Sequence, residues 1–284
     1  MRGAHGGRIG YLVLGSPRTG TNLLCHALHA TGQAGEPAEW YGTSSLHENL
    51  AAQELAHPDS RPGAPRATDW AAYQRALLGR TGSGNRFGVK VFLYHLEPLL
   101  KTGQMASPVD LLPDGYRDDV RIITVSRRDV VAQAVSMIIA SRTGIFVDVP
   151  GVAPRRVPTT TTWWREGPPA ALVTNPEELT ADLFDSAEVH QLITAIRRHH
   201  STWSDWLADT RFPTLSVTYE DLVDRRESVL SSTFELLGIH TRAAEFTDPG
   251  PRRQATALND ELAARYRLWL ADRPGAATTT GRQL

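Results

Sequence analysis

Residues 9–40 read IGYLVLGSPRTGTNLLCHALHATGQAGEPAEW, and this stretch decides the fold. Residues 11–14 are a short apolar run of the kind that forms a buried strand. A small polar turn with one arginine follows at residues 15–21, and apolar residues then recur at helical spacing. A strand, a turn of this composition and a helix together direct backbone N–H groups toward an anion. The stretch therefore predicts that the protein holds a phosphate between residues 16 and 22.

Composition narrows the class of protein. The chain has 284 residues, 41% of them hydrophobic, which is enough for a substantial core. Its formal net charge of −1 argues against bulk nucleic-acid binding. Cys25 is the only cysteine, and no run of 18 apolar residues provides a membrane helix. The first residues lack the apolar core of a signal peptide, so we expect a cytoplasmic protein.

Strands and helices alternate along the rest of the chain. We expect strands at residues 87–93, 120–125 and 214–218, and helices at residues 45–56, 70–78, 130–142 and 176–209, with a further helix ending at residue 237. This alternation predicts an α/β fold with a largely parallel sheet flanked by helices. Ligands bind such sheets beyond the carboxyl ends of the strands. We expect one domain over residues 1–284, with a flexible substrate loop at 143–165 and a disordered tail at 275–284.

The turn after the first strand matches a Walker A loop only in part. Gly15 and Gly20 have the spacing of its two glycines. Thr21 and Asn22 stand where a nucleotide triphosphatase needs lysine followed by serine or threonine. Kinase or ATPase chemistry is therefore poorly supported.

Arg18 lies within the turn instead. A guanidinium stays protonated and forms bidentate pairs with phosphate or sulfate oxygens. Thr19, Thr21 and Asn22 add side-chain donors. The alternative is structural: Ser16 and Thr19 cap the helix, and Arg18 is a solvated turn residue.

A second strand-loop-helix unit follows at residues 120–142. Arg127 comes just after a buried strand and near a helix N-terminus, where it is placed for a second phosphate. Ser136 lies nine residues further on, about two and a half helical turns, so both reach one phosphate only if the helix starts late. Alternatively, Arg128 and Asp129 form an ion pair or cap. Two such units suit a ligand with phosphates at both ends, such as a nucleoside bisphosphate.

These motifs resemble those of sulfotransferases that use 3′-phosphoadenosine 5′-phosphosulfate (PAPS), most closely the bacterial trehalose sulfotransferase family. The family's YLVL strand and Ser-x-Arg-Ser/Thr-Gly-Ser/Thr loop match residues 11–21. Its Gly-Glu-Pro-x-Glu-aromatic segment matches residues 35–40, and its 3′-phosphate signature matches Arg127 with DVVAQAVS at residues 129–136. Ser126 and Arg128 depart from the family's His-Arg-Pro-Asp pattern. The RQA at residues 253–255 and the RYR at residues 265–267 also recur.

The resemblance implies a sulfotransferase fold with a P-loop-type core. It also implies transfer of a sulfuryl group from PAPS to a hydroxyl of a carbohydrate or a sugar-containing natural product, leaving adenosine 3′,5′-bisphosphate. We expect a homodimer that needs no metal, binds no nucleic acid and does not insert stably into a membrane. The cofactor-binding residues implied are Ser16, Pro17, Arg18, Thr19, Gly20, Thr21, Asn22, Arg127, Ser136 and Arg253.

The resemblance points to Glu39 as the base that takes the acceptor's proton, with Arg18 stabilising charge on the departing phosphate. We expect the neighbouring aromatic residues to raise the pKa of Glu39, which would strengthen it as a base. His95 is the rival base, because cytosolic sulfotransferases place a catalytic histidine after a lysine-containing strand. Without the resemblance, Glu36 and Glu39 would be ordinary surface carboxylates.

Several residues are candidates for acceptor binding. Trp163 and Trp164 either stack on a sugar or anchor their loop. His199, His200 and Asp205 hint at a metal site, but adjacent histidines point to different helix faces, so we expect core and surface roles. Two other functions stay open, a small-molecule P-loop kinase and a non-catalytic nucleotide-binding protein. The full acceptor-binding set is Glu36, Trp40, Tyr41, Trp163 and Trp164.

Overall fold

The computed structural model describes residues 7–153, 156–157, 163–164, 171–173, 175, 178–243, 250–251 and 254–273. The chain divides into two compact units. The first comprises Met1–Arg128 and His199–Pro251, and the second comprises Asp129–Arg198 and Arg252–Leu284. Each is described by itself below, and the single domain expected from the sequence stays a prediction.

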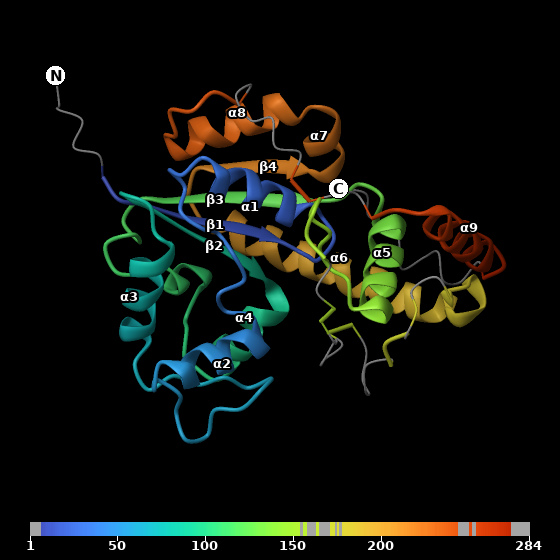
Figure 1. The fold of residues 1–284 in the computed structure, drawn as a ribbon, viewed down its shortest axis with the longest axis horizontal. Helices are drawn as coiled ribbons and strands as arrows, with labels where there is room; N and C mark the ends of the chain where they lie inside the picture. The colour runs from blue at the N-terminus through green and yellow to red at the C-terminus, as the bar shows by residue number, and fades with distance from the viewer. Residues whose placement is uncertain are drawn as a thin grey trace. The chain divides into compact units, whose positions relative to one another are not determined.

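The first unit is built on a parallel sheet (Figure 1). In the described part of the chain it has four strands in the order β2-β1-β3-β4. The strands are β1 Ile9–Gly15, β2 Arg86–Phe92, β3 Val120–Ser126 and β4 Thr214–Thr218. Every residue of β1 and β2 after the first is buried, as expected for parallel strands that are covered on both faces. The predicted α/β fold with a largely parallel sheet is confirmed.

The register brings the carboxyl ends of the strands to one edge of the sheet. Gly15, the last residue of β1, pairs with Phe92 of β2 and with Val125 of β3. Ser126 of β3 pairs with Thr218 of β4. The segments that follow the four strands therefore all begin at this edge, where ligands of parallel sheets bind.

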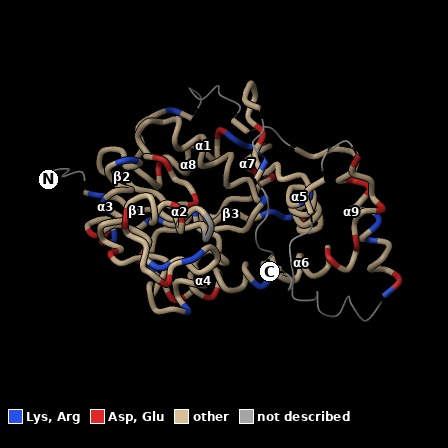
Figure 2. The backbone as a smooth tube through the Cα atoms, turned by 60° about the horizontal axis from the view of Figure 1, so that its bottom comes forward, with Lys and Arg blue, Asp and Glu red and all other residues tan. Residues whose placement is uncertain are grey.

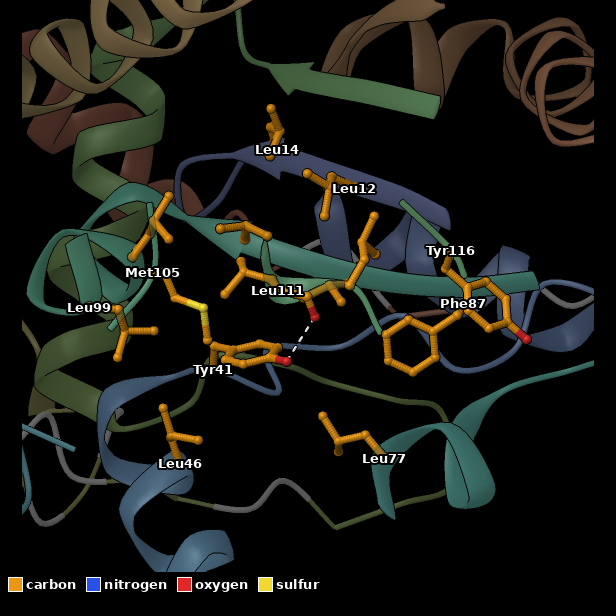
Figure 3. Close-up of a cluster of buried hydrophobic side chains, with 14 of the residues drawn as sticks. Leu12, Leu14, Tyr41, Leu46, Leu77, Phe87, Leu99, Met105, Leu111 and Tyr116 are labelled. Carbon is orange, nitrogen blue, oxygen red and sulfur yellow. Dashed lines mark hydrogen bonds between the residues drawn. The ribbon is translucent and has the colours of Figure 1, made fainter. Parts of the chain in front are cut away.

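Among the described residues, six helices lie wholly within the first unit and pack with the sheet. They are α1 Thr21–Ala30, α2 Thr43–Ala52, α3 Trp70–Thr81, α4 Leu93–Lys101, α7 Tyr219–Asp224 and α8 Arg226–Leu237. Side chains of β1 alternate between two apolar clusters, as the period of two in a strand requires. Leu12 and Leu14 pack with residues of α2, α3 and α4, and part of this cluster is shown in Figure 3. Tyr11 and Val13 pack with α1 and α8.

Several element boundaries differ by a few residues from those expected in this unit. The strand expected at residues 87–93 is β2 Arg86–Phe92, and His95 follows it, as expected, in the first turn of α4. The helix ending at Leu237 is preceded by a separate short helix, because Arg225 leaves helical geometry at φ −131° and ψ 38°. A 3-10 turn at Pro108–Leu111 lies within the region expected to be loop.

The second unit is helical in its described residues. It contains α5 Val130–Thr143, a 3-10 turn at Ala181–Leu183, the first part of α6 Ser186–Ala208, and α9 Ala257–Ala271. Its apolar cluster includes Val135, Leu192 and Tyr266. The sequence reading missed α9, since its buried residues are few among many polar ones.

No helix in the described ranges is both long and apolar enough to cross a membrane. Figure 2 shows basic and acidic residues interspersed along the chain, in keeping with the net charge of −1.

Candidate active site

The turn between β1 and α1 has a backbone suited to an anion. Arg18 and Gly20 both adopt positive φ, 69° and 86°, a conformation that is uncommon for residues other than glycine. A Cβ on Gly20 would lie 2.9 Å from the ring of Tyr219, so glycine is required there for space as well as for φ. In the described residues no side chain caps α1. The first N–H groups of a helix need acceptors from outside the helix, and the capping role considered for Ser16 and Thr19 stays an open alternative.

Buried side chains hold this turn from inside. Ser16 and Thr19 are fully buried, and the Thr19 hydroxyl donates to the Ser16 carbonyl at 2.8 Å. From α6, His200 Nε2 lies 3.2 Å from Ser16 Oγ, and the Trp203 indole N–H donates to the Gly15 carbonyl at 3.3 Å. Burial lowers the pKa of His200, which favours the neutral imidazole. The sequence reading did not foresee that α6 braces the turn.

Two arginines influence each other at the ends of β1 and β3. Burial, followed by the nearby charge of Arg127, lowers the pKa of Arg18 to about 10, although Tyr219 opposes the shift. The Arg127 guanidinium carbon lies 4.6 Å from the centroid of the Tyr219 ring, a cation–π contact. Arg18 remains protonated at neutral pH, and two half-buried like charges that repel each other favour an anion beside them.

Glu39 returns to the same edge of the sheet. Ala38 forms a parallel bridge to Val89, and its carbonyl accepts the Lys90 N–H at 3.0 Å, so the segment after α1 runs alongside β2. The buried Lys90 ammonium lies 2.7 Å from Glu39 Oε1 and also donates to Asn22 Oδ1, in the first turn of α1. The carboxylate is therefore fixed beside the helix that follows the anion-binding turn.

The pKa of Glu39 is lowered, and the expectation that it is raised was wrong. Burial alone raises it, but the charges of Lys90 and His95 and the Lys90 hydrogen bond together outweigh burial. The aromatic residues that follow Glu39 in the sequence, Trp40 and Tyr41, make hydrogen bonds to other residues. Trp40 donates its indole N–H to the Glu36 carbonyl at 2.9 Å, and the Tyr41 hydroxyl donates to the Leu111 carbonyl at 2.7 Å in the core (Figure 3).

His95 lies beside Glu39, so the structure brings both candidate bases together. Its Nδ1 is 3.8 Å from Glu39 Oε2 and makes no hydrogen bond to the described residues. Burial lowers the pKa of His95 to about 4; Glu39 raises it, and Lys90 lowers it further. The imidazole is consequently neutral at pH 7.

The buried His95 predicts a specific pH dependence of stability. The native imidazole stays neutral down to about pH 4, whereas an unfolded histidine takes up a proton near pH 6.5. Between these values the unfolded state binds more protons, so lowering the pH destabilises the native state, by up to about 1.4 kcal/mol per pH unit for this group. Urea unfolding between pH 7 and pH 5 should show a shallower loss of stability in His95→Gln. Equal slopes in the two proteins would contradict the burial of a neutral His95.

The expected acceptor-binding residues have different settings. Glu36 is exposed and Trp40 half-buried, whereas Tyr41 is only 2% exposed. In the second unit, Trp163 and Trp164 form an edge-to-face pair with centroids 5.6 Å apart and pack on that unit's apolar cluster. This packing fits the loop-anchor alternative, and the acceptor roles stay predictions.

Tyr41 offers a direct check on its role. Its hydroxyl bonds a backbone carbonyl inside the core, so Tyr41→Phe should cost about 1 kcal/mol of unfolding free energy. We expect the KM for the acceptor to stay unchanged, because the ring keeps its packing. Urea unfolding and steady-state kinetics measure the two effects. A raised acceptor KM at unchanged stability would show instead that the hydroxyl contacts the acceptor.

The second predicted anion loop is divided between the two units. Arg128 pairs with Glu220 and Asp221, its Nη2 lying 2.9 Å from Asp221 Oδ1. Asp129 accepts the Ala132 N–H at 2.9 Å and caps α5. These contacts match the ion pair and cap considered as the alternative for these two residues.

For some of the predicted site residues, the described part of the structure does not test the expected role. Ser136 is half-buried within α5 of the second unit, so its sharing of a phosphate with Arg127 stays a prediction. Arg253, residues 154–155, 158–162 and 165 of the loop at 143–165, and the tail at 275–284 lie outside the described residues. His199 is fully buried and stacks with Tyr94 at 6.4 Å between centroids. No cluster of three or more histidine, cysteine or acidic residues suited to a metal ion occurs in the described ranges.

The parallel sheet and the turn at residues 16–20 define an α/β protein of P-loop type. The model of the Stf0 sulphotransferase family matches residues 10–268, and the chain belongs to this family of sulfotransferases.

Named relatives agree with this assignment. The chain is 28% identical over 279 residues to the trehalose 2-sulfotransferase of Mycolicibacterium smegmatis, covering 90% of this chain and 94% of that protein. It is 26% identical over 283 residues to the trehalose 2-sulfotransferase of Mycobacterium tuberculosis, with the same coverage. Among solved structures it is similar to a sulfotransferase domain from the curacin biosynthetic pathway, at 15% identity and a TM-score of 0.44, covering 90% of this chain and 82% of that one.

Proposed function

We propose that the protein transfers a sulfuryl group from PAPS to a hydroxyl of a carbohydrate or a sugar-containing natural product. Family membership supports sulfotransfer, and the names of the two mycobacterial relatives support a carbohydrate acceptor. One observation carries the proposal for this chain: the Glu39 carboxylate is fixed beside the first turn of α1, next to an anion-binding turn that contains Arg18. A base and a donor site at one edge are what such a transfer needs.

The donor's two ends would be held by different loops. Arg18 and the backbone of residues 16–22 would bind the 5′-phosphosulfate, where the buried guanidinium stabilises charge on the departing phosphate. Arg127 and Ser136 would bind the 3′-phosphate, and Arg253 would close over the cofactor. The mutual repulsion of Arg18 and Arg127 is relieved when an anion binds, which supports this division.

The reaction moves one sulfuryl group in line between two oxygens. The bond from sulfur to the bridging phosphate oxygen breaks, and a bond from sulfur to the acceptor oxygen forms. The acceptor's proton passes to Glu39, and adenosine 3′,5′-bisphosphate leaves. Positioning and charge stabilisation account for most of the catalysis in this kind of transfer.

Glu39 is favoured over His95 as the base. The Glu39 side chain is 35% exposed, so an acceptor can reach it, whereas that of His95 is 9% exposed. His95 would then shape the pocket around the carboxylate.

A transfer assay tests the proposal. The purified protein is incubated with radiolabelled PAPS and a panel of sugars and glycosylated natural products, and products are identified by the mass added by sulfation. We expect label in at least one sugar-bearing acceptor and none when ATP and Mg²⁺ replace PAPS. Phosphorylated products from ATP would instead establish the kinase alternative. Binding of adenosine 3′,5′-bisphosphate with no transfer to any acceptor would favour the non-catalytic alternative.

Homodimer formation and a cytoplasmic location complete the proposal. Light scattering of the purified protein tests the first.

A further inference from the structure

Lys90 is an unusual residue for its position. It is one of two lysines in the chain, and it lies in the buried strand β2. It pairs in register with Val13, whose side chain packs in the cluster that includes α1. Paired residues of parallel strands point to the same face, so the Lys90 side chain is directed to the face that α1 covers. A buried lysine at this place needs partners, because an isolated ammonium is costly to bury.

The partners of Lys90 come from two parts of the site. Its Nζ lies 2.7 Å from Glu39 Oε1, donates to Asn22 Oδ1 and sits 5.5 Å from the centroid of the Phe92 ring. An ammonium has three N–H donors, and these contacts engage two oxygen acceptors among the described residues. The third donor is therefore available to a further acceptor.

Asn22 shows where that acceptor would arrive. It is the second residue of α1, the helix whose N-terminus would receive the phosphosulfate under the function proposed above. An anion bound at this turn lies next to a residue that already holds Lys90. The ammonium thus stands between two negative groups, the Glu39 carboxylate and the incoming donor.

We propose that the donor competes with Glu39 for Lys90, so that donor binding releases the carboxylate to act as the base. This exchange rests on the proposed PAPS-dependent transfer and adds an order to it. Without donor, Lys90 holds Glu39 as a paired, weakly basic carboxylate. With donor bound, Lys90 turns to the anion, and Glu39 faces the acceptor's hydroxyl with its counter-charge withdrawn.

The electrostatics agree with the exchange. Lys90 contributes to the lowered pKa of Glu39 both by its charge and by a hydrogen bond, so withdrawing it raises the basicity of the carboxylate. His95, the other neighbour, is neutral at pH 7 and cannot replace the lost charge. The exchange keeps Glu39 weakly basic until the sulfuryl group is in place.

A double-mutant cycle on donor binding tests the exchange. PAPS is titrated calorimetrically, without acceptor, into wild type, Glu39→Gln, Lys90→Met and the double variant. Removing Glu39 frees Lys90, so Glu39→Gln should bind PAPS about tenfold more tightly than wild type, a size typical of coupled sites. In the Lys90→Met background the same change should have little effect. Lys101→Met is the matched control, since this exposed lysine contacts only Glu97 in the described structure, at 4.0 Å.

The outcomes separate the exchange from the proposed function. Equal gains from Glu39→Gln with and without Lys90 would reflect simple removal of a negative charge and would overturn the exchange, as would no gain at all. Both results leave PAPS binding, and hence the proposed function, intact. Failure of wild type to bind PAPS would overturn both.

A measurement on wild type avoids dependence on the folding of Lys90→Met. A crystal structure with PAPS bound and no acceptor should show Lys90 Nζ on an oxygen of the phosphosulfate and more than 4 Å from Glu39 Oε1, compared with the 2.7 Å described above. A crystal structure of the protein alone should keep the pair at about 2.7 Å. An unchanged Lys90–Glu39 pair in that complex would overturn the exchange.

Discussion

Glu39→Gln is expected to lower kcat for sulfate transfer about 10³-fold, within the range that a general base contributes. Glutamine keeps the size of the side chain, but it has no charge to hold Lys90 and cannot take the acceptor's proton. The loss should appear in kcat with no weakening of donor binding, because Glu39 contacts Lys90 rather than the anion-binding turn. Single-turnover transfer of radiolabelled sulfate from PAPS measures the step directly.

His95→Gln is the matched comparison, since His95 lies 3.8 Å from the same carboxylate. We expect it to lower kcat by about tenfold or less, through the pocket around Glu39. Near-normal kcat in Glu39→Gln together with a large loss in His95→Gln would reverse the assignment. Both variants should be checked for native stability, because His95 is buried.

Arg18→Gly is expected to lower kcat/KM for PAPS about 10³-fold while leaving the fold intact or slightly stabilised. The guanidinium is the charge within the turn, and losing a preorganised donor to the transferring group has an effect of this order. Arg18 has a φ of 69°, a strained conformation for any residue with a Cβ. Glycine relieves that strain, so the substitution separates the role in binding from the role in folding.

Thermal unfolding and donor kinetics on the same sample measure the two effects. A strained backbone conformation at a residue other than glycine is typical of functional sites, where the role of the side chain outweighs the cost of the strain. A marked fall in Tm with little change in kcat/KM would show that Arg18 supports the turn instead of the donor. Arg18→Lys keeps a positive charge without the planar fork, and we expect it to recover only part of the activity.

Much of the fold could be predicted because the decisive signals are local. The apolar runs and the turn at residues 15–21 indicated the parallel strands and α1, and β4 has the predicted bounds, Thr214–Thr218. The expected strand was carried one residue too far, to residue 93, because apolar residues continue from β2 into α4 without a polar turn. The helix α9 was missed because only one narrow face of it is buried.

For the candidate site, the sequence indicated the order of the motifs along the chain but not the electrostatics. Family resemblance pointed to Glu39, but the sequence did not reveal that Lys90 would pair with it across 51 residues. A charged residue inside an apolar strand was the available signal. The pKa of Glu39 was expected to be raised because aromatic residues follow it in the sequence. In the structure the Tyr41 hydroxyl donates to a carbonyl in the core, and the charge that lowers the pKa of Glu39 comes from Lys90 on β2. Long-range pairing of this kind needs the fold.

The central claim is that the turn at residues 16–22 and the loop at Arg127 bind a nucleotide with phosphates at both ends. Calorimetric titration of wild type with adenosine 3′,5′-bisphosphate, in metal-free buffer, tests it most directly, with adenosine 5′-monophosphate and ATP with Mg²⁺ as comparisons. We predict saturable binding of the bisphosphate that is at least about tenfold tighter than binding of either comparison ligand. Absence of bisphosphate binding, or tighter binding of ATP with Mg²⁺, would contradict the claim.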